Sequence, residues 1–357
     1  MLIRGGRVVD PAQGIDGLFD VRLGDVISQI GEHLEPQGDE CIFDASGAFV
    51  APGFIDMHVH LRDPGDPEKE TIATGTAAAV RGGFTAVACM PNTRPALDSR
   101  ERLGALAHAI AARAACRVYP IAAITRGRQG KEPLDYAALA AAGAVAFSDD
   151  GDPVLDGDLL RRAALLARIA SGAFIEHALD ERMREEGIIE RDAHISAETG
   201  KTWHIAHVST AVALDVIRAA RERGTAITCE VTPHHLYFTE EIVMERGGLA
   251  KVYPPLRPRQ DVDAIRGAVL RGEIDCFASD HAPHAQREKG LPYSEAAPGF
   301  TGLEIAIGAY ALALPELSPS RFVAMGSTNP ARVLGTPGGT LAVGTRADVS
   351  IFADRPW

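Results

Sequence analysis

The sequence lacks the features of several protein classes. No uncharged apolar run approaches ~20 residues, the length that a membrane-spanning helix needs, and the opening MLIRGGRVVDP has no apolar core of a secretory signal. Lysine and arginine form no cluster, and the 357 residues carry a net charge of −12. Membranes and nucleic acids are therefore poor candidate partners, whereas a local arginine or histidine can still hold a small anionic substrate.

Cysteine is also scarce and forms no C-x-x-C pair. The five cysteines are scattered, mostly within apolar segments: Cys41, Cys89, Cys116, Cys229 and Cys276. This pattern favours buried free thiols in a reducing compartment, so we expect a cytoplasmic protein. The remaining composition, 46% hydrophobic and 24% charged, is that of a globular chain with one large core or two domains.

Eight short apolar segments alternate with longer segments of helical period. The predicted strands are 54–61, 85–92, 117–125, 144–151, 173–178, 202–209, 226–233 and 274–281. Several intervening segments end in glycine, which is typical of a helix C-terminus. Eight strands separated by helices predict parallel βα units, and eight such units close a (β/α)8 TIM barrel of the α/β class, here over residues 51–337.

The two ends of the chain have a different rhythm. Residues 1–50 and 338–357 read as short alternating strands with turns. Neither piece buries enough apolar surface alone. We therefore predict that both pair into one small β-sandwich domain.

Histidines and carboxylates gather where the predicted strands end. These residues are His58, His60, Asp149, Asp150, His177, His204, His207 and Asp280, with His284 shortly beyond. Active sites of TIM barrels lie at the carboxyl ends of the strands. Imidazoles and carboxylates without thiolates form a set of metal ligands, so the pattern predicts a metal centre.

The segment FIDMHVHLRDPG is the most specific of these patterns. Residues two apart on a strand point to the same side, so His58 and His60 can both turn into the barrel mouth and bind one ion. Arg62 follows His60 by two positions, just past the strand end, so its side chain is expected on the same side, where it can reach a substrate anion. A lone strand histidine is more often a core residue, but the surrounding set favours the metal site.

Other positions have competing interpretations. One of Asp149 and Asp150 can ligate while the other caps the following helix or accepts hydrogen bonds from nearby backbone. His204 is more typical of packing or of support for a ligand, because His207 lies nearer the strand end. Asp280 could cap a helix, although its place in SDHAPH favours ligation.

Six motifs together carry a family resemblance. The segments PGFIDMHVHLRDPG, GGFTAVACMPNTRP, FSDDG, IAHVST, EVTPHHL and ASDHAPH resemble the amidohydrolase superfamily, specifically the bacterial class I dihydroorotases. GFTGLE (299–304) and NPARVLG (329–335) add to the likeness, which covers nearly the whole chain.

The resemblance implies a zinc centre with one or two ions. His58, His60 and Asp280 would bind one ion and His177 with His207 a second. Asp150 would bridge the two, at a position where many amidohydrolases have a carboxylated lysine. The resemblance also implies that Arg62, Asn92 and His284 hold a substrate carboxylate.

The implied reaction interconverts N-carbamoyl-L-aspartate and L-dihydroorotate in de novo pyrimidine (UMP) biosynthesis. Asp280 is expected to accept a proton from the attacking water and to return it to the ring nitrogen. A homodimer is expected, with aspartate transcarbamoylase as a candidate partner. One alternative is a related cyclic amidase (hydantoinase, dihydropyrimidinase or allantoinase), and another is a non-catalytic dihydroorotase-like subunit of aspartate transcarbamoylase.

The chain departs from the family pattern in three places. Tyr253 in KVYPPLR stands where the family usually has an asparagine, so one substrate contact is expected to be missing or replaced. Only thirty residues separate His177 from His207 (207 − 177), fewer than in relatives. The chain stops at DRPW, so the small domain is expected to be incomplete as given. The segment after His284, AQREKGLPYSEAAPGF, is expected to be a lid or a solvated loop.

Overall fold

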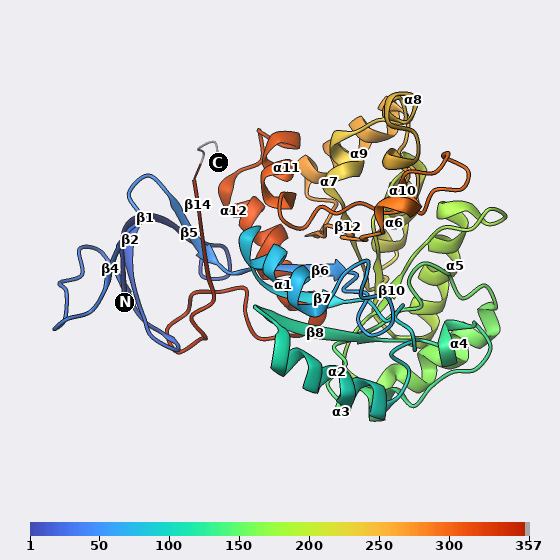
Figure 1. Ribbon diagram of the computed structural model, residues 1–357, viewed down its shortest axis with the longest axis horizontal. Coiled ribbons are helices and arrows are strands. Elements are labelled where there is room, and N and C mark those ends of the chain that lie inside the picture. Colours follow the sequence, from blue (N-terminus) through green and yellow to red (C-terminus); the bar gives the residue numbers. More distant parts are fainter. Residues whose placement is uncertain (354–357) are drawn as a thin grey trace.

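A computed structural model describes residues 1–353 and contains the predicted barrel (Figure 1). Its strands are β6 (Phe54–Val59), β7 (Phe84–Cys89), β8 (Arg117–Ala122), β9 (Ala146–Phe147), β10 (Phe174–Glu176), β11 (Trp203–Ile205), β12 (Ile227–Val231) and β13 (Cys276–Phe277). They form one sheet in which the strands follow one another in the order of the chain. Each strand from β6 to β13 runs parallel to the next. Val59 bridges to His281 beyond β13, and the backbone N–H of His60 donates to the His281 carbonyl at 2.8 Å. The sheet thus closes on itself, and the predicted barrel is confirmed.

The barrel strands are shorter than predicted at their carboxyl ends. Strand β6 ends at Val59, so His60 lies in the following loop. The pairing of β6 with β7 is also irregular between Asp56 and Val59. Such irregularities re-aim side chains at strand ends. His58 and His60 therefore reach the same site through the irregular end of β6 and the loop after it, and not through the alternation of side chains along a strand alone.

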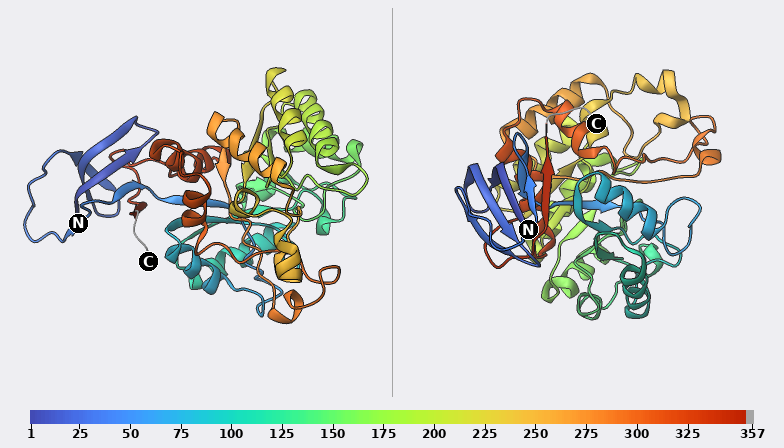
Figure 2. Two further views of the ribbon diagram at one scale, coloured as in Figure 1. Left: turned by 90° about the horizontal axis from the view of Figure 1, so that it is seen from above. Right: turned by 60° about the vertical axis from the view of Figure 1, so that its left-hand side comes forward.

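Helices surround the barrel (Figures 1 and 2). The longer ones are α1 (Ile72–Arg81), α2 (Arg100–Arg113), α4 (Gly157–Leu166), α5 (Arg184–Thr199), α6 (Ala211–Glu222), α9 (Arg259–Arg271) and α11 (Ala306–Ala313). The shorter ones are α3 (Tyr136–Ala141), α7 (Pro233–Tyr237), α8 (Ile242–Arg246), α10 (Gln286–Lys289), α12 (Pro319–Val323) and α13 (Asn329–Leu334). The side chains of Thr71, Ser99 and Thr210 each accept a hydrogen bond from the first turn of the helix they precede. These caps fix where α1, α2 and α6 begin.

Both ends of the chain meet in a separate six-stranded sheet, at the left of Figure 1. Its strands are β1 (Leu2–Asp10), β2 (Ile15–Leu23), β3 (Ile27–Gly31), β4 (Ile42–Asp44), β5 (Phe49–Pro52) and β14 (Val349–Phe352). Strand β14 pairs antiparallel with β5, so the predicted association of the two ends is confirmed. The exact domain boundaries stay predictions, and residues 354–357 of the predicted small domain lie outside the described residues.

The core is mainly the layer between the barrel and its helices. Phe147, Phe174 and Trp203 come from three consecutive strands and pack edge to face, with ring centroids 5.1 to 6.0 Å apart. All three are fully buried. Such packing holds the strands rigidly, and a rigid scaffold is what the loops at the carboxyl ends require to place side chains accurately.

None of the helices within residues 1–353 is long and apolar enough to span a membrane.

Candidate metal centre and substrate site

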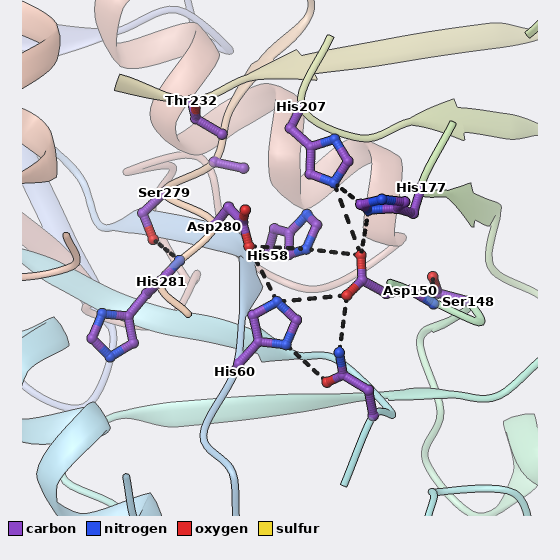
Figure 3. A network of polar contacts seen from close by, with 12 residues as sticks. His58, His60, Ser148, Asp150, His177, His207, Thr232, Ser279, Asp280 and His281 are labelled. Atoms are coloured by element: carbon purple, nitrogen blue, oxygen red, sulfur yellow. Dashed lines mark hydrogen bonds and ion pairs between the residues drawn. The ribbon is translucent and has the colours of Figure 1, made fainter. Parts of the chain in front are cut away.

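Six predicted ligands converge at the carboxyl ends of the barrel strands (Figure 3). They are His58, His60, Asp150, His177, His207 and Asp280, and none is more than 6% exposed. They come from β6 and from the loops that follow β6, β9, β10, β11 and β13. The convergence that the sequence predicts is therefore present, while their role as ligands stays a prediction.

The six side chains divide into two overlapping groups around Asp150. The ligand atoms of His58, His60 and Asp150 lie within 4.8 Å of one another, and so do those of Asp150, His177 and His207. Asp280 reaches the first group, because its Oδ1 lies 3.1 Å from His60 Nε2 and 3.5 Å from His58 Nε2. Asp150 is thus the one carboxylate that both groups share, which matches the bridging position implied by the family resemblance.

The backbone is strained at three of the site residues. Arg62, His207 and Asp280 have φ angles of 55°, 34° and 46°, in the left-handed region that residues other than glycine rarely adopt. Such a conformation costs on the order of 1–3 kcal/mol and persists only where the surroundings enforce it. Next to Asp280, the backbone of His281 is held by the Ser279 hydroxyl and by the N–H of His60. Strain of this kind clusters at functional sites.

The carboxylates favour positive charge at the centre of the cluster. Burial lowers the pKa of His58, but the charges of Asp150, Glu230 and Asp280 outweigh it and raise that pKa well above its ordinary value. Burial likewise raises the pKa of Asp150, yet the neighbouring His58 and His177 hold it well below the usual range. This electrostatic preference is what a cation-binding site requires.

The buried nitrogens of the cluster also fit a metal ion. Within residues 1–353, His58 Nε2 and His207 Nδ1 are fully buried and make no hydrogen bond. A buried polar atom without a partner costs about 1–3 kcal/mol. His58 Nε2 faces the oxygens of Asp150 and Asp280 at 3.3 and 3.5 Å, where a shared cation would satisfy all three atoms. Nitrogen and oxygen donors without thiolates suit a divalent ion such as zinc.

The structure separates the two adjacent aspartates. Asp149 turns away from the histidines and accepts hydrogen bonds from the backbone N–H groups of Ile124 and Thr125, at 2.8 and 3.1 Å, and from the Thr125 hydroxyl. Asp150 faces the ligands instead. One aspartate therefore anchors the loop after β8 so that the other is presented to the site.

Glu230 is a site residue that our sequence analysis missed. Its carboxylate is fully buried on β12 and lies 2.7 Å from His58 Nδ1 and 3.2 Å from His204 Nε2. The signal was present, since a glutamate in the middle of the apolar strand ITCEV needs a polar partner inside the barrel. His204 supports the site from behind, one of the two interpretations that its sequence position allows.

The predicted substrate residues flank the ligand cluster. Arg62 Nη2 lies 3.3 Å from His284 Nε2, and Arg62 Nε donates to the Pro283 carbonyl at 3.2 Å. The pKa of His284 is lowered to about 4 by burial and by the positive charges of Arg62 and Lys69. At neutral pH the pair therefore has one fixed cation, Arg62, beside a neutral imidazole.

Asn92 has a second task that its sequence position did not indicate. Its amide oxygen lies 2.8 Å from His60 Nδ1, and its Nδ2 donates to Asp150 Oδ2 at 3.1 Å. Asn92 thus orients two of the predicted ligands. One N–H of the amide remains available for a substrate, because Nδ2 carries two hydrogens.

Tyr253 covers the imidazole of His177. The two rings stack with centroids 4.9 Å apart and planes 25° apart, and Tyr253 is 38% exposed. Helix α5 begins at Arg184, so residues 178–183 alone connect His177 to it. Tyr253 therefore covers one face of the His177 ring.

Comparisons with known proteins agree with this geometry. Residues 49–356 match the amidohydrolase family, and the chain belongs to this family. Curated relatives within it are dihydroorotases. That of Pelotomaculum thermopropionicum is 44% identical over 99% of this chain and 88% of its own length. That of Aquifex aeolicus is 41% identical over 100% of this chain and 90% of its own length.

Solved structures share the fold at lower identity. The L-hydantoinase (dihydropyrimidinase) from Arthrobacter aurescens superposes with a TM-score of 0.89 at 22% identity, covering 98% of this chain and 85% of that one. The alignment with the Pelotomaculum enzyme extends over 379 positions, 22 more than the 357 residues here. At least that many positions of the relative therefore have no counterpart in this chain.

Proposed function

We propose that this protein is a zinc-dependent dihydroorotase, which interconverts N-carbamoyl-L-aspartate and L-dihydroorotate in pyrimidine biosynthesis. The observation that carries the proposal is the position of Arg62, which lies 3.3 Å from His284 and close enough to Asp280 and Asp150 for the charges of both carboxylates to act on it. A cation there suits a cyclic amide that bears a carboxylate. Relatives of this activity, at 44% and 41% identity over nearly the whole chain, support the same conclusion.

The metal part of the proposal assigns each ligand to an ion. His58, His60 and Asp280 would hold one zinc, and His177 with His207 a second. Asp150 would bridge them, since it belongs to both ligand groups. When bound, zinc supplies Lewis-acid activation of a water and of the scissile carbonyl.

The protein's own residues supply proton transfer and orientation. Hydrolysis forms a C–O bond at the ring carbonyl and breaks its C–N bond. Asp280 takes the proton of the attacking water and returns it to the leaving ring nitrogen, as a general base and then a general acid. Arg62 clamps the substrate carboxylate with two parallel hydrogen bonds, and His284 with Asn92 completes the clamp.

The first alternative is a cyclic amidase for neutral rings. The hydantoinase structures share the fold, but at 22% identity they support nothing beyond it. A neutral ring has no need of Arg62. Tyr253, in place of an asparagine, is the feature that keeps this alternative worth testing.

The second alternative is a non-catalytic subunit of aspartate transcarbamoylase. A subunit without catalysis has no requirement for a complete ligand set, whereas all six predicted ligands are present and converge. Association with aspartate transcarbamoylase, a homodimeric state and a cytoplasmic location remain predictions of the proposal. Light scattering of the purified protein, alone and mixed with that enzyme, measures the first two.

A side-by-side assay tests the proposal. Purified protein is analysed for bound metal and assayed with dihydroorotate, hydantoin and allantoin, with and without aspartate transcarbamoylase. We expect bound zinc and turnover of dihydroorotate well above that of the neutral rings. Turnover of hydantoin or allantoin alone would favour the first alternative. Binding to aspartate transcarbamoylase without turnover of any of the three substrates would favour the second.

A further inference from the structure

A chain of buried polar groups extends from His58 into the barrel wall. Glu230 Oε1 lies 2.7 Å from His58 Nδ1, and Glu230 Oε2 lies 3.2 Å from His204 Nε2. His204 Nδ1 in turn lies 2.8 Å from the hydroxyl of Thr228. His58, His204 and Glu230 are all 0% exposed. The chain crosses three strands, because His58 is on β6, His204 on β11, and Thr228 and Glu230 on β12.

The two oxygens of Glu230 have separate partners. An ionised carboxylate only accepts hydrogen bonds, so the His58 nitrogen that faces it must carry the proton. In the neutral ring, which is the form that binds a metal ion, the other nitrogen of His58, Nε2, then has the free lone pair. Within residues 1–353, His58 Nε2 makes no hydrogen bond, and it faces Asp150 and Asp280 at 3.3 and 3.5 Å. Glu230 also approaches the second ligand group, since the backbone N–H of His207 points at its Oε1 at 3.4 Å.

We propose that Glu230, supported by His204, is a positioning residue of the metal centre: it holds His58 in the Nδ1–H tautomer and aims Nε2 at the ion. The inference rests on the metal centre of the proposed function. A hydrogen bond from the far nitrogen of a ligating histidine to a carboxylate fixes the ring and makes the ligating nitrogen more basic. Loss of such a partner typically weakens metal binding about 10–100-fold.

A purely structural role for the same groups makes a different prediction. If Glu230 and His204 only satisfy each other inside the core, their loss would lower stability and leave metal affinity unchanged. Glu230→Gln separates the two roles, because glutamine keeps the shape and can still accept from His58 while the charge is removed. His204→Gln tests the supporting step, and Thr228→Val tests the far end of the chain.

Glu176 provides a matched control. It is a glutamate on β10 that is 3% exposed and precedes the predicted ligand His177 in the sequence. Glu176→Gln therefore makes the same substitution at another buried glutamate of the barrel, close to the same cluster. Any loss of metal affinity that is specific to Glu230→Gln cannot be assigned to general disturbance of the barrel.

The experiment measures zinc affinity by competition with a chelator, well below the unfolding temperature of each variant. We expect Glu230→Gln to bind zinc about 10–100-fold more weakly than the parent and Glu176→Gln to bind it equally well. His204→Gln should lose less, and the double variant should be no worse than Glu230→Gln, since both changes break one chain. The visible spectrum of the cobalt-loaded Glu230→Gln variant should also change, because His58 Nε2 becomes a less basic ligand when the carboxylate charge is removed.

Parent-like zinc affinity and cobalt spectrum in Glu230→Gln would overturn the inference, and so would fully additive losses in the double variant. If Glu230→Gln does not fold, His204→Gln and Thr228→Val carry the same test, and parent-like zinc affinity in both would overturn it. The readout is independent of turnover. A zinc-loaded parent that fails to hydrolyse dihydroorotate would refute the proposed function while the role of Glu230 stands.

Discussion

The aromatic ring of Tyr253 lies flat against the imidazole of His177, with centroids 4.9 Å apart and planes 25° apart. This contact joins the residue that departs most from the family pattern to a predicted metal ligand. A stacked ring restrains the imidazole without occupying its edge, so His177 Nδ1 still lies 3.7 Å from Asp150 Oδ1. Tyr253 therefore acts on the site through the orientation of His177.

Substitution of Tyr253 should separate stacking from the phenol group. We expect Tyr253→Phe to keep the parent's stability and metal content, because the ring stays in place. Tyr253→Ala should lose about 0.5–1.5 kcal/mol of aromatic pairing and part of the zinc held by the second ligand group. Chemical denaturation and metal analysis of both variants measure these effects. Equal zinc content in the alanine variant would show that His177 needs no such support.

Asp280→Asn should separate metal binding from proton transfer. The amide cannot accept the proton of the attacking water, so we expect turnover of dihydroorotate to fall about 10²–10⁴-fold, the usual contribution of general acid–base catalysis. His58, His60 and Asp150 remain in place, and zinc should still bind. Turnover near the parent's level in a zinc-loaded variant would exclude Asp280 as the proton carrier.

Arg62→Met should act on substrate binding more than on chemistry. Hydrogen bonds to a charged group contribute about 1.5–3 kcal/mol, so we expect the KM for dihydroorotate to rise roughly 10–100-fold. The control is a neutral cyclic amide, whose turnover, where measurable, should be little changed. An unchanged KM for dihydroorotate would mean that the carboxylate is held elsewhere.

The barrel and its ligand cluster could be predicted because their signals are local. Each predicted strand is a short apolar segment, and the ligands follow the strands directly, so parallel strand order brings Asp150, His207 and Asp280 together. The predicted strands extend too far at their carboxyl ends, because residues such as His60 leave the strand pairing and belong to the loops of the site. Whether a residue pairs or turns there depends on the closure between Val59 and His281, which are far apart in the sequence.

The support behind the ligands could not be assigned from sequence. Glu230 lies 172 positions from His58, and only the closed barrel places its oxygen 2.7 Å from the imidazole. The orienting role of Asn92 depends in the same way on its contact with Asp150, 58 positions away. The stacking of Tyr253 on His177 likewise needs two distant loops. Such contacts are decided by tertiary packing: the glutamate within ITCEV indicates that a buried polar partner exists, but the sequence does not say which residue that partner is.

A buried lysine outside the site provides a test of the fold's pH dependence. Lys201 is 4% exposed, donates to the carbonyls of Ala167 and Ala170 at 2.9 and 3.0 Å, and lies over the rings of Phe147 and Phe174. Burial lowers its pKa from 10.5 to about 8. Between about pH 8 and 10.5 the folded protein therefore releases a proton that the unfolded chain keeps.

Because the unfolded state binds more protons in this window, the contribution of Lys201 to the free energy of unfolding rises as pH increases from about 8 towards 10.5. Below pH 8 the lysine is charged in both states, and the cost of burying that charge is fully present. We expect the stability of the parent relative to Lys201→Met to increase across this window, as measured by denaturant midpoints at pH 7.5, 8.5 and 9.5. The exposed Lys131, changed to Met, is the control for general alkaline effects. A difference between parent and Lys201→Met that stays constant with pH would show that the buried amine keeps its ordinary pKa, with the carbonyls and rings around it offsetting the loss of water.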